Sequence, residues 1–260
     1  MQHIYLIRHG QASFGAENYD KLSALGQRQA KVIGEYFAQQ NIKIAHIIHG
    51  QMSRQQETAE LIAKHANFNN KLILHKGANE FDSEHLIEHY LPILAKQSLK
   101  LRQTMESGDD WWAKGENFEI FFRALVALWQ QDDYCPFESW EHFKQRCLNC
   151  LTDVAQISEQ AKTKNSENRG ATLVATSGGL ISVIMQSILA SDTSSFNNRA
   201  FMDMNLTINN TSMTEVVWQA NQPVDSMTED LTFKYRNRLI CFNNVTPLLL
   251  AKESDLITRK

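Results

Sequence analysis

Hydrophobic and polar positions along this chain predict strands that alternate with helices. The apolar run 4–7 is typical of a buried strand, and Ser23 is placed to cap a helix that extends to about residue 40. A second short strand is expected at 44–49, followed by a helix at 53–66. Further strands are expected at 71–75, 171–176, 214–219 and 238–243, and an apolar helix at 180–189. This alternation predicts a three-layer α/β/α fold with a mostly parallel central sheet.

Between residues 81 and 165 the pattern changes to one helix after another, and Trp129 and Trp140 lie within this stretch. We expect a helical insertion in a single domain of residues 1–260, packed beside the carboxyl ends of the strands. Ligands bind at that end of such sheets. The polar stretch 162–169 reads as a solvated loop that returns the chain to the sheet.

The composition is that of a soluble globular protein with enough apolar material for one large domain, since 43% of the 260 residues are hydrophobic and 21% are charged. A formal net charge of -3 argues against nucleic acid or an anionic membrane as the main partner. No apolar run approaches the ~20 residues of a membrane span. The strand pattern begins within the first few residues, where a signal peptide would otherwise lie, so a cytoplasmic location is expected.

Four cysteines are too few to suggest a disulfide framework, although Cys147 and Cys150 form a C-x-x-C. The segment 139–162 that contains them reads as one helix, and no second pair completes a zinc site. We therefore expect two buried or half-buried thiols on one helix face, and neither a metal nor another cofactor.

The first strand stops at Arg8-His9-Gly10, three residues with complementary chemistry toward phosphate. Arginine binds phosphate oxygens in a bidentate fork, histidine can attack phosphorus, and glycine lets backbone N–H groups approach an anion. A tripeptide recurs by chance, however, and this one would equally suit a capped strand end. Other motifs have to decide between the two interpretations.

Three motifs occur in a specific order and spacing. They are Arg8-His9-Gly10-Gln11 after the first strand, Leu22-Ser23-x-x-Gly26-x-x-Gln29-Ala30 at the start of the first helix, and Arg54-x-x-x-Thr58-Ala59 after the second strand. Together with Glu80 and the strand–glycine turn at 176–179, they resemble the histidine phosphatase superfamily, whose fold is phosphoglycerate-mutase-like. The resemblance covers about 1–80 and 170–245 and leaves the insertion free.

The resemblance implies a role for each matching residue. His9 would be the nucleophile and form a phosphohistidine that water hydrolyses. Arg8 and Arg54 would clamp the equatorial oxygens of the phosphoryl group, so that no metal is needed. Glu80 would protonate the leaving oxygen and then help to activate water. Candidates for neutral contacts to phosphate or substrate are Gln11, Ser13, Asn18, Ser23, His49, Ser177 and Gly178.

Several of these residues also have ordinary structural interpretations. Arg54 could be a helix-surface arginine that pairs with Glu57 or Asp82. Glu80 could be a solvated loop carboxylate, and Ser13 and Asn18 are equally suited to turns.

The chain departs from the family pattern at residue 177, where a second histidine is expected and a serine stands. A serine hydroxyl can donate one hydrogen bond to phosphate but cannot carry the charge of an imidazolium. The deficit could be on the order of a hundredfold in rate. His49, at the end of the second strand, is a hypothetical replacement imidazole; otherwise it is a strand-end histidine that faces solvent.

The turn at Ser177 also resembles the nucleophile elbow of serine hydrolases, with Ala175 in place of the first glycine. In that fold the catalytic histidine follows the serine. All nine histidines of this chain precede Ser177, which argues against such a hydrolase.

The sequence therefore predicts a phosphatase that hydrolyses a phosphate monoester of a small molecule or a phosphoprotein. Hydrolysis is preferred to mutase action because the longer substrate-binding signature of the mutases is not evident in residues 14–19. The alternative is a catalytically weak or inactive phosphate-binding or interaction protein of the same fold, which Ser177 favours. The apolar insertion would be compatible with a homodimer.

Overall fold

The computed structural model describes residues 2–13, 20–106, 115–164, 170–189, 198–218, 237–253 and 255–259. The strands are β1 (Gln2–Arg8), β2 (Ile44–His49), β3 (Ile73–Leu74), β4 (Ala171–Thr176), β5 (Met213–Trp218) and β6 (Arg238–Asn244). The helices are α1 (Ala24–Gln39), α2 (Ser53–His65), α3 (Ser83–Gln97), α4 (Leu99–Glu106), α5 (Gly115–Trp129), α6 (Trp140–Lys164), α7 (Gly178–Leu189), α8 (Asn198–Thr207) and α9 (Thr246–Leu250), with a 3₁₀ turn, η1, at Lys76–Ala78.

The strands form one six-stranded sheet in the order β3-β2-β4-β1-β5-β6. The four strands from β3 to β1 are parallel, whereas β5 is antiparallel to both β1 and β6. All six residues of β4 are buried, as expected for a central strand that helices cover on both faces. The mixed α/β fold with a mostly parallel sheet is the predicted one.

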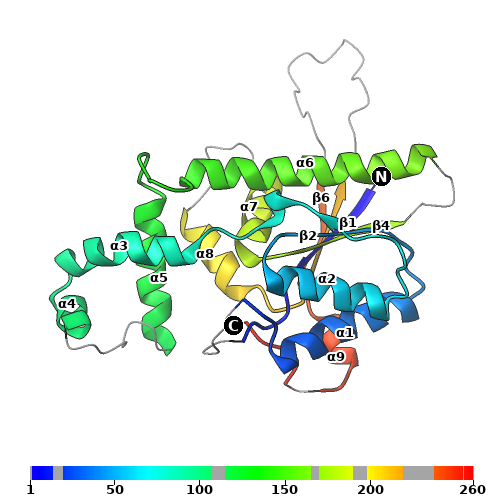
Figure 1. Cartoon of the computed structure of the whole chain (residues 1–260), viewed down its shortest axis with the longest axis horizontal. Coiled ribbons are helices and arrows are strands. Elements are labelled where there is room, and N and C mark those ends of the chain that lie inside the picture. Colours follow the sequence, from blue (N-terminus) through cyan, green and yellow to red (C-terminus); the bar gives the residue numbers. More distant parts are fainter. Residues whose placement is uncertain are drawn as a thin grey trace, which may run out of the picture.

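Helices cover both faces of the sheet (Figure 1). On one face, α1, α2 and α9 pack over a cluster that includes Ile7, Ile33, Ile47 and Leu173. Ser23 caps α1 as predicted, because its hydroxyl accepts the backbone N–H of Gly26 at 3.0 Å. Helices α6 and α7 cover the other face.

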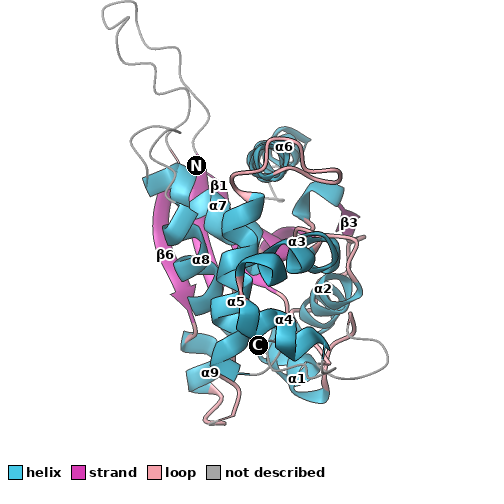
Figure 2. Cartoon of the chain, turned by 90° about the vertical axis from the view of Figure 1, so that its left-hand side faces the viewer, coloured by secondary structure: helices cyan, strands magenta, loops and turns pink. Residues whose placement is uncertain are grey.

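Helices α3 to α6 occupy residues 83–164, and most of them lie beyond the carboxyl end of β1 (Figure 1). From that end α3, α4 and α5 lie in front of the sheet (Figure 2). Their core is aromatic and centres on Phe81, whose ring lies 5.2 Å from Trp129, 5.4 Å from Phe143 and 6.3 Å from Phe201 of α8. The packing of these helices therefore fixes the residue that follows Glu80.

Four elements differ clearly from the sequence-based expectations. β3 has two residues instead of five, since only Ile73 and Leu74 pair with β2. α7 begins at Gly178, two residues earlier than predicted, where the absence of a side chain lets Asn205 and Glu80 lie close to the first turn. Helices α8 and α9 were not predicted.

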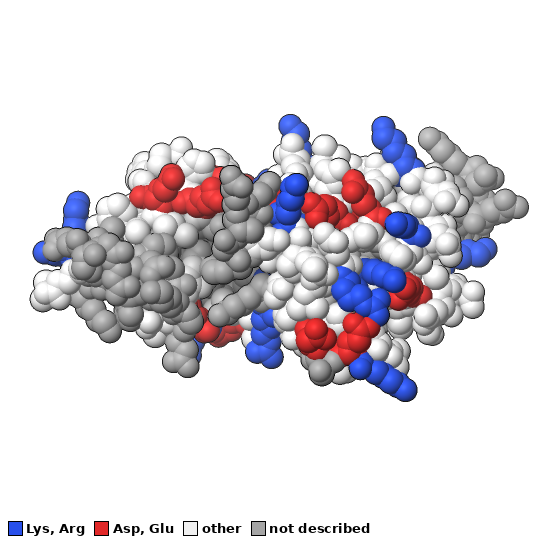
Figure 3. Space-filling view, turned by 60° about the horizontal axis from the view of Figure 1, so that its bottom comes forward, with Lys and Arg blue, Asp and Glu red and all other residues white. Residues whose placement is uncertain are grey.

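Cys147 and Cys150 are buried in α6, as expected from their helical spacing. Burial raises the pKa of the Cys150 thiol to about 12, so it stays protonated and unreactive at neutral pH. None of the described helices is both long enough and apolar enough to cross a membrane. On the face that Figure 3 shows, acidic and basic side chains are interspersed rather than gathered by sign.

Candidate active site

The carboxyl ends of β1 and β4 bring the first site residues together. Arg8 is level with Thr176 in the parallel register, and the backbone N–H of His9 donates to the Thr176 carbonyl at 2.8 Å. His9 and Ser177 directly follow these two adjacent strands and are therefore neighbours at the carboxyl end of the sheet.

His9 is held as a neutral imidazole with a defined tautomer. Its Nδ1 lies 2.8 Å from the carbonyl oxygen of Gly10, which can only accept, so Nδ1 carries the proton. Nε2 then keeps its lone pair and accepts a hydrogen bond from Nε of Arg54 at 3.1 Å. Burial lowers the pKa of His9 well below 6.5, and the positive charges of Arg54 and Arg8 lower it further. The side chain thus presents a buried, unprotonated ring nitrogen beside two guanidiniums.

Arg54 lies in the first turn of α2, where Asp20 orients it. One Asp20 oxygen is 2.6 Å from Nη1 of Arg54, and the other accepts the backbone N–H of Ser53 at 2.7 Å. Asp20 thereby satisfies a helix N-terminus and fixes the arginine with the same carboxylate. The two partners considered from the sequence are engaged elsewhere: Glu57 accepts the N–H of Leu22, and Asp82 caps α3.

Arg8 reaches from β1 toward two late segments of the chain. Its Nη1 donates to the carbonyl oxygens of Ile208 and, at 3.2 Å, of Arg259. Its charge lowers the pKa of His9 and opposes the rise in the pKa of Glu80, so it acts on both groups.

Glu80 lies at the N-terminus of α7, where one carboxylate oxygen accepts the backbone N–H of Gly179 at 2.9 Å. Burial raises the pKa of this carboxyl above its usual range, while the Gly179 N–H and Arg54 act in the opposite direction. A carboxyl with a raised pKa can hold a proton and donate it.

An arginine of α6 holds the loop before Glu80. Arg146 donates to the carbonyl oxygens of Gly77 at 3.1 Å and of Asn79 at 2.8 Å, and it pairs with Glu138 at 2.6 Å. Helix α6 therefore helps to position the Glu80 carboxyl.

Ser177 is buried and bound by a residue that the motif analysis did not single out. Nε2 of Gln55, a fully buried side chain of α2, donates to Oγ of Ser177 at 2.8 Å and to the carbonyl of Ala78 at 3.1 Å. Because the amide nitrogen only donates, the serine oxygen accepts here, and the serine O–H can be given to another acceptor.

A model of the family described as "Histidine phosphatase superfamily (branch 1)" matches residues 4–131. The chain belongs to the histidine phosphatase superfamily. The matched range contains Arg8, His9, Arg54 and Glu80 of the site described above.

Sequence relatives of this superfamily member include the mitochondrial serine/threonine-protein phosphatase PGAM5 of Xenopus laevis, 37% identical over 82 residues, which are 30% of each chain. The probable phosphoglycerate mutase GpmB of Enterobacter sp. (strain 638) is 29% identical over 137 residues, 49% of this chain and 62% of that one. The chain thus spans less than two thirds of the length of either relative.

Solved structures share the fold along nearly the whole chain. Phosphoglycerate mutase from Bacillus anthracis str. Sterne has a TM-score of 0.57 and 18% identity, and the match covers 97% of both chains. A mycobacterial glucosyl-3-phosphoglycerate phosphatase in complex with VO3 has a TM-score of 0.57 and 17% identity, over 94% of this chain and 100% of that one. At such identities the likeness concerns the fold.

The turn that carries His9 is fixed by side chains of α1 and α2. The N–H of Gly10 donates to Oγ1 of Thr58 at 3.0 Å, and the N–H of Gln11 donates to Oε1 of Gln29 at 2.9 Å. Gly10 and Gly26 lie so close that a Cβ on either would collide with the backbone of the other segment. This close approach explains the glycines of the first two motifs.

A late segment of the chain supports the same turn. Asn210 donates from Nδ2 to the carbonyl of His9 at 3.2 Å, and its own Oδ1 accepts from the hydroxyl of Thr258 at 2.9 Å. The same hydroxyl oxygen accepts from Nε2 of Gln29 at 2.9 Å. Thr258 therefore joins the supports on the two sides of His9.

The other residues predicted to contact phosphate or substrate lie at several different positions around the site. Gln11 and Ser23 are bonded to each other, since the serine hydroxyl donates to Oε1 of Gln11 at 2.9 Å. The backbone of Ser13 bonds to that of Lys21, and Asn18 lies outside the described residues. Gly178 begins α7 and packs against the Asn205 side chain.

His49 is buried rather than solvent-facing, and its Nδ1 bonds to the carbonyl of Gly50 at 2.7 Å. Both His49 and Ile7 are level with Ala175, so His49 lies two residues behind the level of His9 and Ser177 along the parallel strands. The strand register therefore sets the backbone of His49 apart from the level of His9.

Sequence reasoning missed Asp20, Gln55 and Asn210. Gln55 had a signal, because it shares the buried helix face of Thr58, Ala59 and Ile62, where a polar side chain needs a partner. Asp20 and Asn210 had none, because they are polar residues without a local pattern. Within the described residues, no group of three or more His, Cys, Asp or Glu side chains is placed to hold a metal ion.

Proposed function

We propose that this histidine phosphatase superfamily member is a phosphoric monoester hydrolase that works through a phosphohistidine on Nε2 of His9. The observation that carries the proposal is the neutral, buried Nε2 lone pair of His9 beside Arg54, with Arg8 and a buried Glu80 of raised pKa close enough to affect the same charges. Nucleophile, charge clamp and acid are the three parts that phosphoryl transfer requires.

In the first step, the phosphoryl oxygens of the substrate take the guanidinium N–H donors of Arg54 and Arg8. The Nε2 lone pair of His9 forms a bond to phosphorus, and the bond from phosphorus to the ester oxygen breaks with its electron pair on that oxygen. Glu80 donates its proton to the leaving oxygen. The two arginines stabilise the charge on the equatorial oxygens.

In the second step, the Glu80 carboxylate takes a proton from a water molecule whose oxygen attacks phosphorus. The nitrogen–phosphorus bond breaks, which releases inorganic phosphate and restores the neutral imidazole. Ser177 supplies a neutral hydrogen bond to the phosphoryl group, with Gln55 holding its oxygen so that the proton is available. The relatives include phosphatases for proteins and for small molecules, which supports a phosphate monoester as the substrate class.

The test is the hydrolysis of p-nitrophenyl phosphate by the wild-type protein and by His9→Ala, without added metal. Turnover that disappears with His9→Ala is the expected result. Rapid quenching with ³²P-labelled substrate should leave an acid-labile, alkali-stable label on the wild-type protein only, as a phosphohistidine would. Equal background rates in both proteins would contradict the proposal.

The second candidate is a phosphate-binding or interaction protein without turnover. It is favoured by Ser177, which cannot supply the cationic donor of the family pattern. This candidate predicts that inorganic phosphate binds to the wild-type protein and not to Arg54→Ala, while no ester is hydrolysed.

A further inference from the structure

One face of helix α8 lies along the proposed active site. Phe201, Asn205 and Ile208 are spaced four and three residues apart, so they share this face. Ile208 directly follows α8, and the hydrogen bond from its N–H to the carbonyl of Met204 continues the helical pattern by one residue. We call these three residues the inner face of α8.

The two ends of the inner face contact segments that carry the proposed acid and one of the arginines. Phe201 packs on Phe81, which directly follows Glu80, with ring centroids 6.3 Å apart. At the other end, the carbonyl of Ile208 accepts a hydrogen bond from Nη1 of Arg8. The inner face thus extends from the segment of Glu80 to the guanidinium of Arg8.

Asn205, in the middle of the inner face, contacts the turn between β4 and α7. Its Oδ1 lies so close to Gly178 that a Cβ on this glycine would be 2.2 Å from it. Ser177 directly precedes Gly178, and its hydroxyl has a proton to donate because Gln55 donates to its oxygen. Asn205 therefore contacts the residue next to the neutral donor of the phosphoryl site.

The Asn205 amide is the polar group of an otherwise apolar face. Phe201 and Ile208 are fully buried, whereas Asn205 is half-buried. Within the part of the chain that the structure describes, no group accepts a hydrogen bond from its amide nitrogen. A primary amide has two N–H donors, and phosphate oxygens are acceptors. Asn205 thus brings two unused donors to the side of the phosphoryl site.

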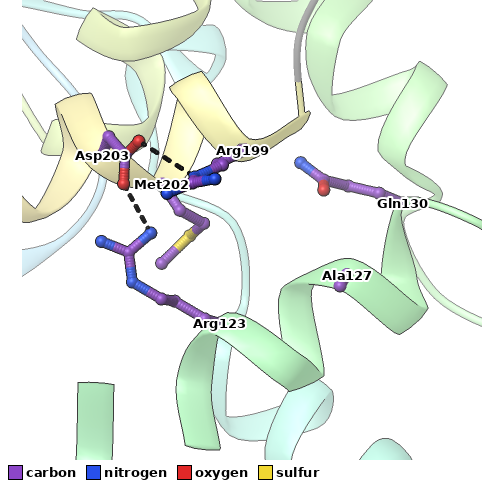
Figure 4. Close-up of a pocket in the computed structure, with 6 residues that line it drawn as sticks. All are labelled: Arg123, Ala127, Gln130, Arg199, Met202 and Asp203. Carbon is purple, nitrogen blue, oxygen red and sulfur yellow. Dashed lines mark ion pairs between the residues drawn. The ribbon is translucent and has the colours of Figure 1, made fainter. Parts of the chain in front are cut away.

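Other contacts of α8 hold the helix in place without Asn205. Asp203 stands two residues before Asn205, about 200° around the helix. It pairs with Arg123 of α5 at 2.7 Å (Figure 4). Phe201 also packs on Trp140 of α6, with ring centroids 4.7 Å apart. A change at Asn205 therefore leaves the contacts of α8 with α5 and α6 intact.

We propose that Asn205 is a further phosphate-binding residue, whose amide nitrogen donates to an oxygen of the phosphoryl group beside the hydroxyl of Ser177. The inference rests on the proposed function, because it adds a contact to the same phosphoryl site. Two neutral donors, a hydroxyl from the β4–α7 turn and an amide from α8, then bind the phosphoryl oxygens together. Arg8 and Arg54 supply the positive charge.

The first test measures the binding of inorganic phosphate, so it does not depend on turnover. Calorimetric titration of the full-length protein should show that Asn205→Ala binds phosphate about tenfold more weakly than the wild type, since the variant lacks a donor to a charged acceptor. Asn205→Asp keeps the size of the side chain and its packing against Gly178, but it replaces the donor with an anion. It should therefore bind phosphate more weakly still. Asn149→Ala, the same change at an exposed asparagine of α6, should bind as the wild type does.

The second test assays the same variants with p-nitrophenyl phosphate and with an alkyl phosphate. Asn205→Ala should lower kcat/KM for both by a similar factor, because the two substrates share the phosphoryl group. An Asn205→Asp variant that binds phosphate like the wild type would overturn the inference, since packing alone would then explain the residue. Losses confined to the esters, with unchanged affinity for inorganic phosphate, would overturn it too. If the wild type hydrolyses no ester, the phosphatase proposal fails, and the titration still decides whether Asn205 binds phosphate.

Discussion

The turns that follow β1 and β2 are locally alike. Each is a histidine followed by a glycine, with ring Nδ1 bonded to the glycine carbonyl, at 2.8 Å for His9 and 2.7 Å for His49. Both histidines are 7% exposed. In both turns a Cβ on the glycine would collide with a neighbouring segment, Gly26 for Gly10 and the Gln55 side chain for Gly50. Nothing within either dipeptide distinguishes a nucleophile from a structural histidine.

The two turns differ in what surrounds them. Nε2 of His9 accepts from Arg54, and the carbonyl of His9 accepts from Asn210. The carbonyl of His49 instead accepts the N–H of His75, as part of ordinary strand pairing at the sheet edge. The chemistry of a histidine at a strand end is therefore decided by register and by long-range partners. This difference can be tested by changing the partners one at a time.

The largest expected effect separates the two histidines themselves. His9→Ala should lower kcat for p-nitrophenyl phosphate about a thousandfold or more, because it removes the atom that attacks phosphorus. His49→Ala should change kcat less than about threefold, since His49 is level with Ala175, two residues before Ser177. Steady-state rates of the two purified variants measure this directly. A large loss in His49→Ala would instead support this residue as a replacement for the missing second histidine.

The next effect concerns Glu80, the proposed acid. The rate should fall at low pH as His9 becomes protonated, at a pH below 6.5 because its pKa is lowered. It should fall at high pH as Glu80 loses its proton, at a pH above 4.5 because its pKa is raised. The value of kcat/KM for an alkyl phosphate is thus expected to follow a bell-shaped pH profile. The effect of substrate ionisation is measured separately, and the profile is corrected for it.

Glu80→Gln provides the matching variant. It should lower the rate for an alkyl phosphate about a hundredfold, because the amide has no acidic proton to transfer to the leaving oxygen. It should also flatten the high-pH side of the profile, because the amide does not titrate. p-Nitrophenyl phosphate, whose leaving group needs little protonation, should lose less. An unchanged high-pH side would show that another group titrates there.

Variants of Gln55 test whether Ser177, on the strand connection between the two histidine turns, contributes to phosphate binding. Ser177→Ala and Gln55→Leu should each lower kcat and weaken inhibition by inorganic phosphate about tenfold, and the double variant should be little worse than either one, since both break the same contact. Gln56→Leu, on the exposed side of the same helix, is the matched control. Additive losses would mean that the glutamine does not act through the serine. A merely structural role would alter thermal stability without altering phosphate inhibition.

The sequence predicted those parts of the molecule that depend on local patterns. β2 and β4 have their predicted bounds because their apolar runs are continuous, and the motifs pointed to His9, Arg54 and Glu80. The supports were not predictable because their partners lie far apart in sequence, 34 residues for Arg54 and Asp20 and 122 for Gln55 and Ser177. The length of β3 depends on how many of its residues pair with β2. The pattern of apolar and polar residues in the sequence does not determine that number.

The smallest expected effect lies at the most distant support of the His9 turn. Thr258→Val removes a hydroxyl that donates to Asn210 and accepts from Gln29, so both supports lose a fixed partner and the turn carrying His9 gains freedom. We expect kcat to fall about fivefold, the equivalent of about 1 kcal/mol, which is typical for the loss of a hydrogen bond. Thr152→Val in α6, which removes a hydroxyl bond to the Leu148 carbonyl, should cost comparable thermal stability without changing kcat. Equal kcat losses in the two variants would show that this support contributes only general stability, and that the two histidine turns are held equally well without it.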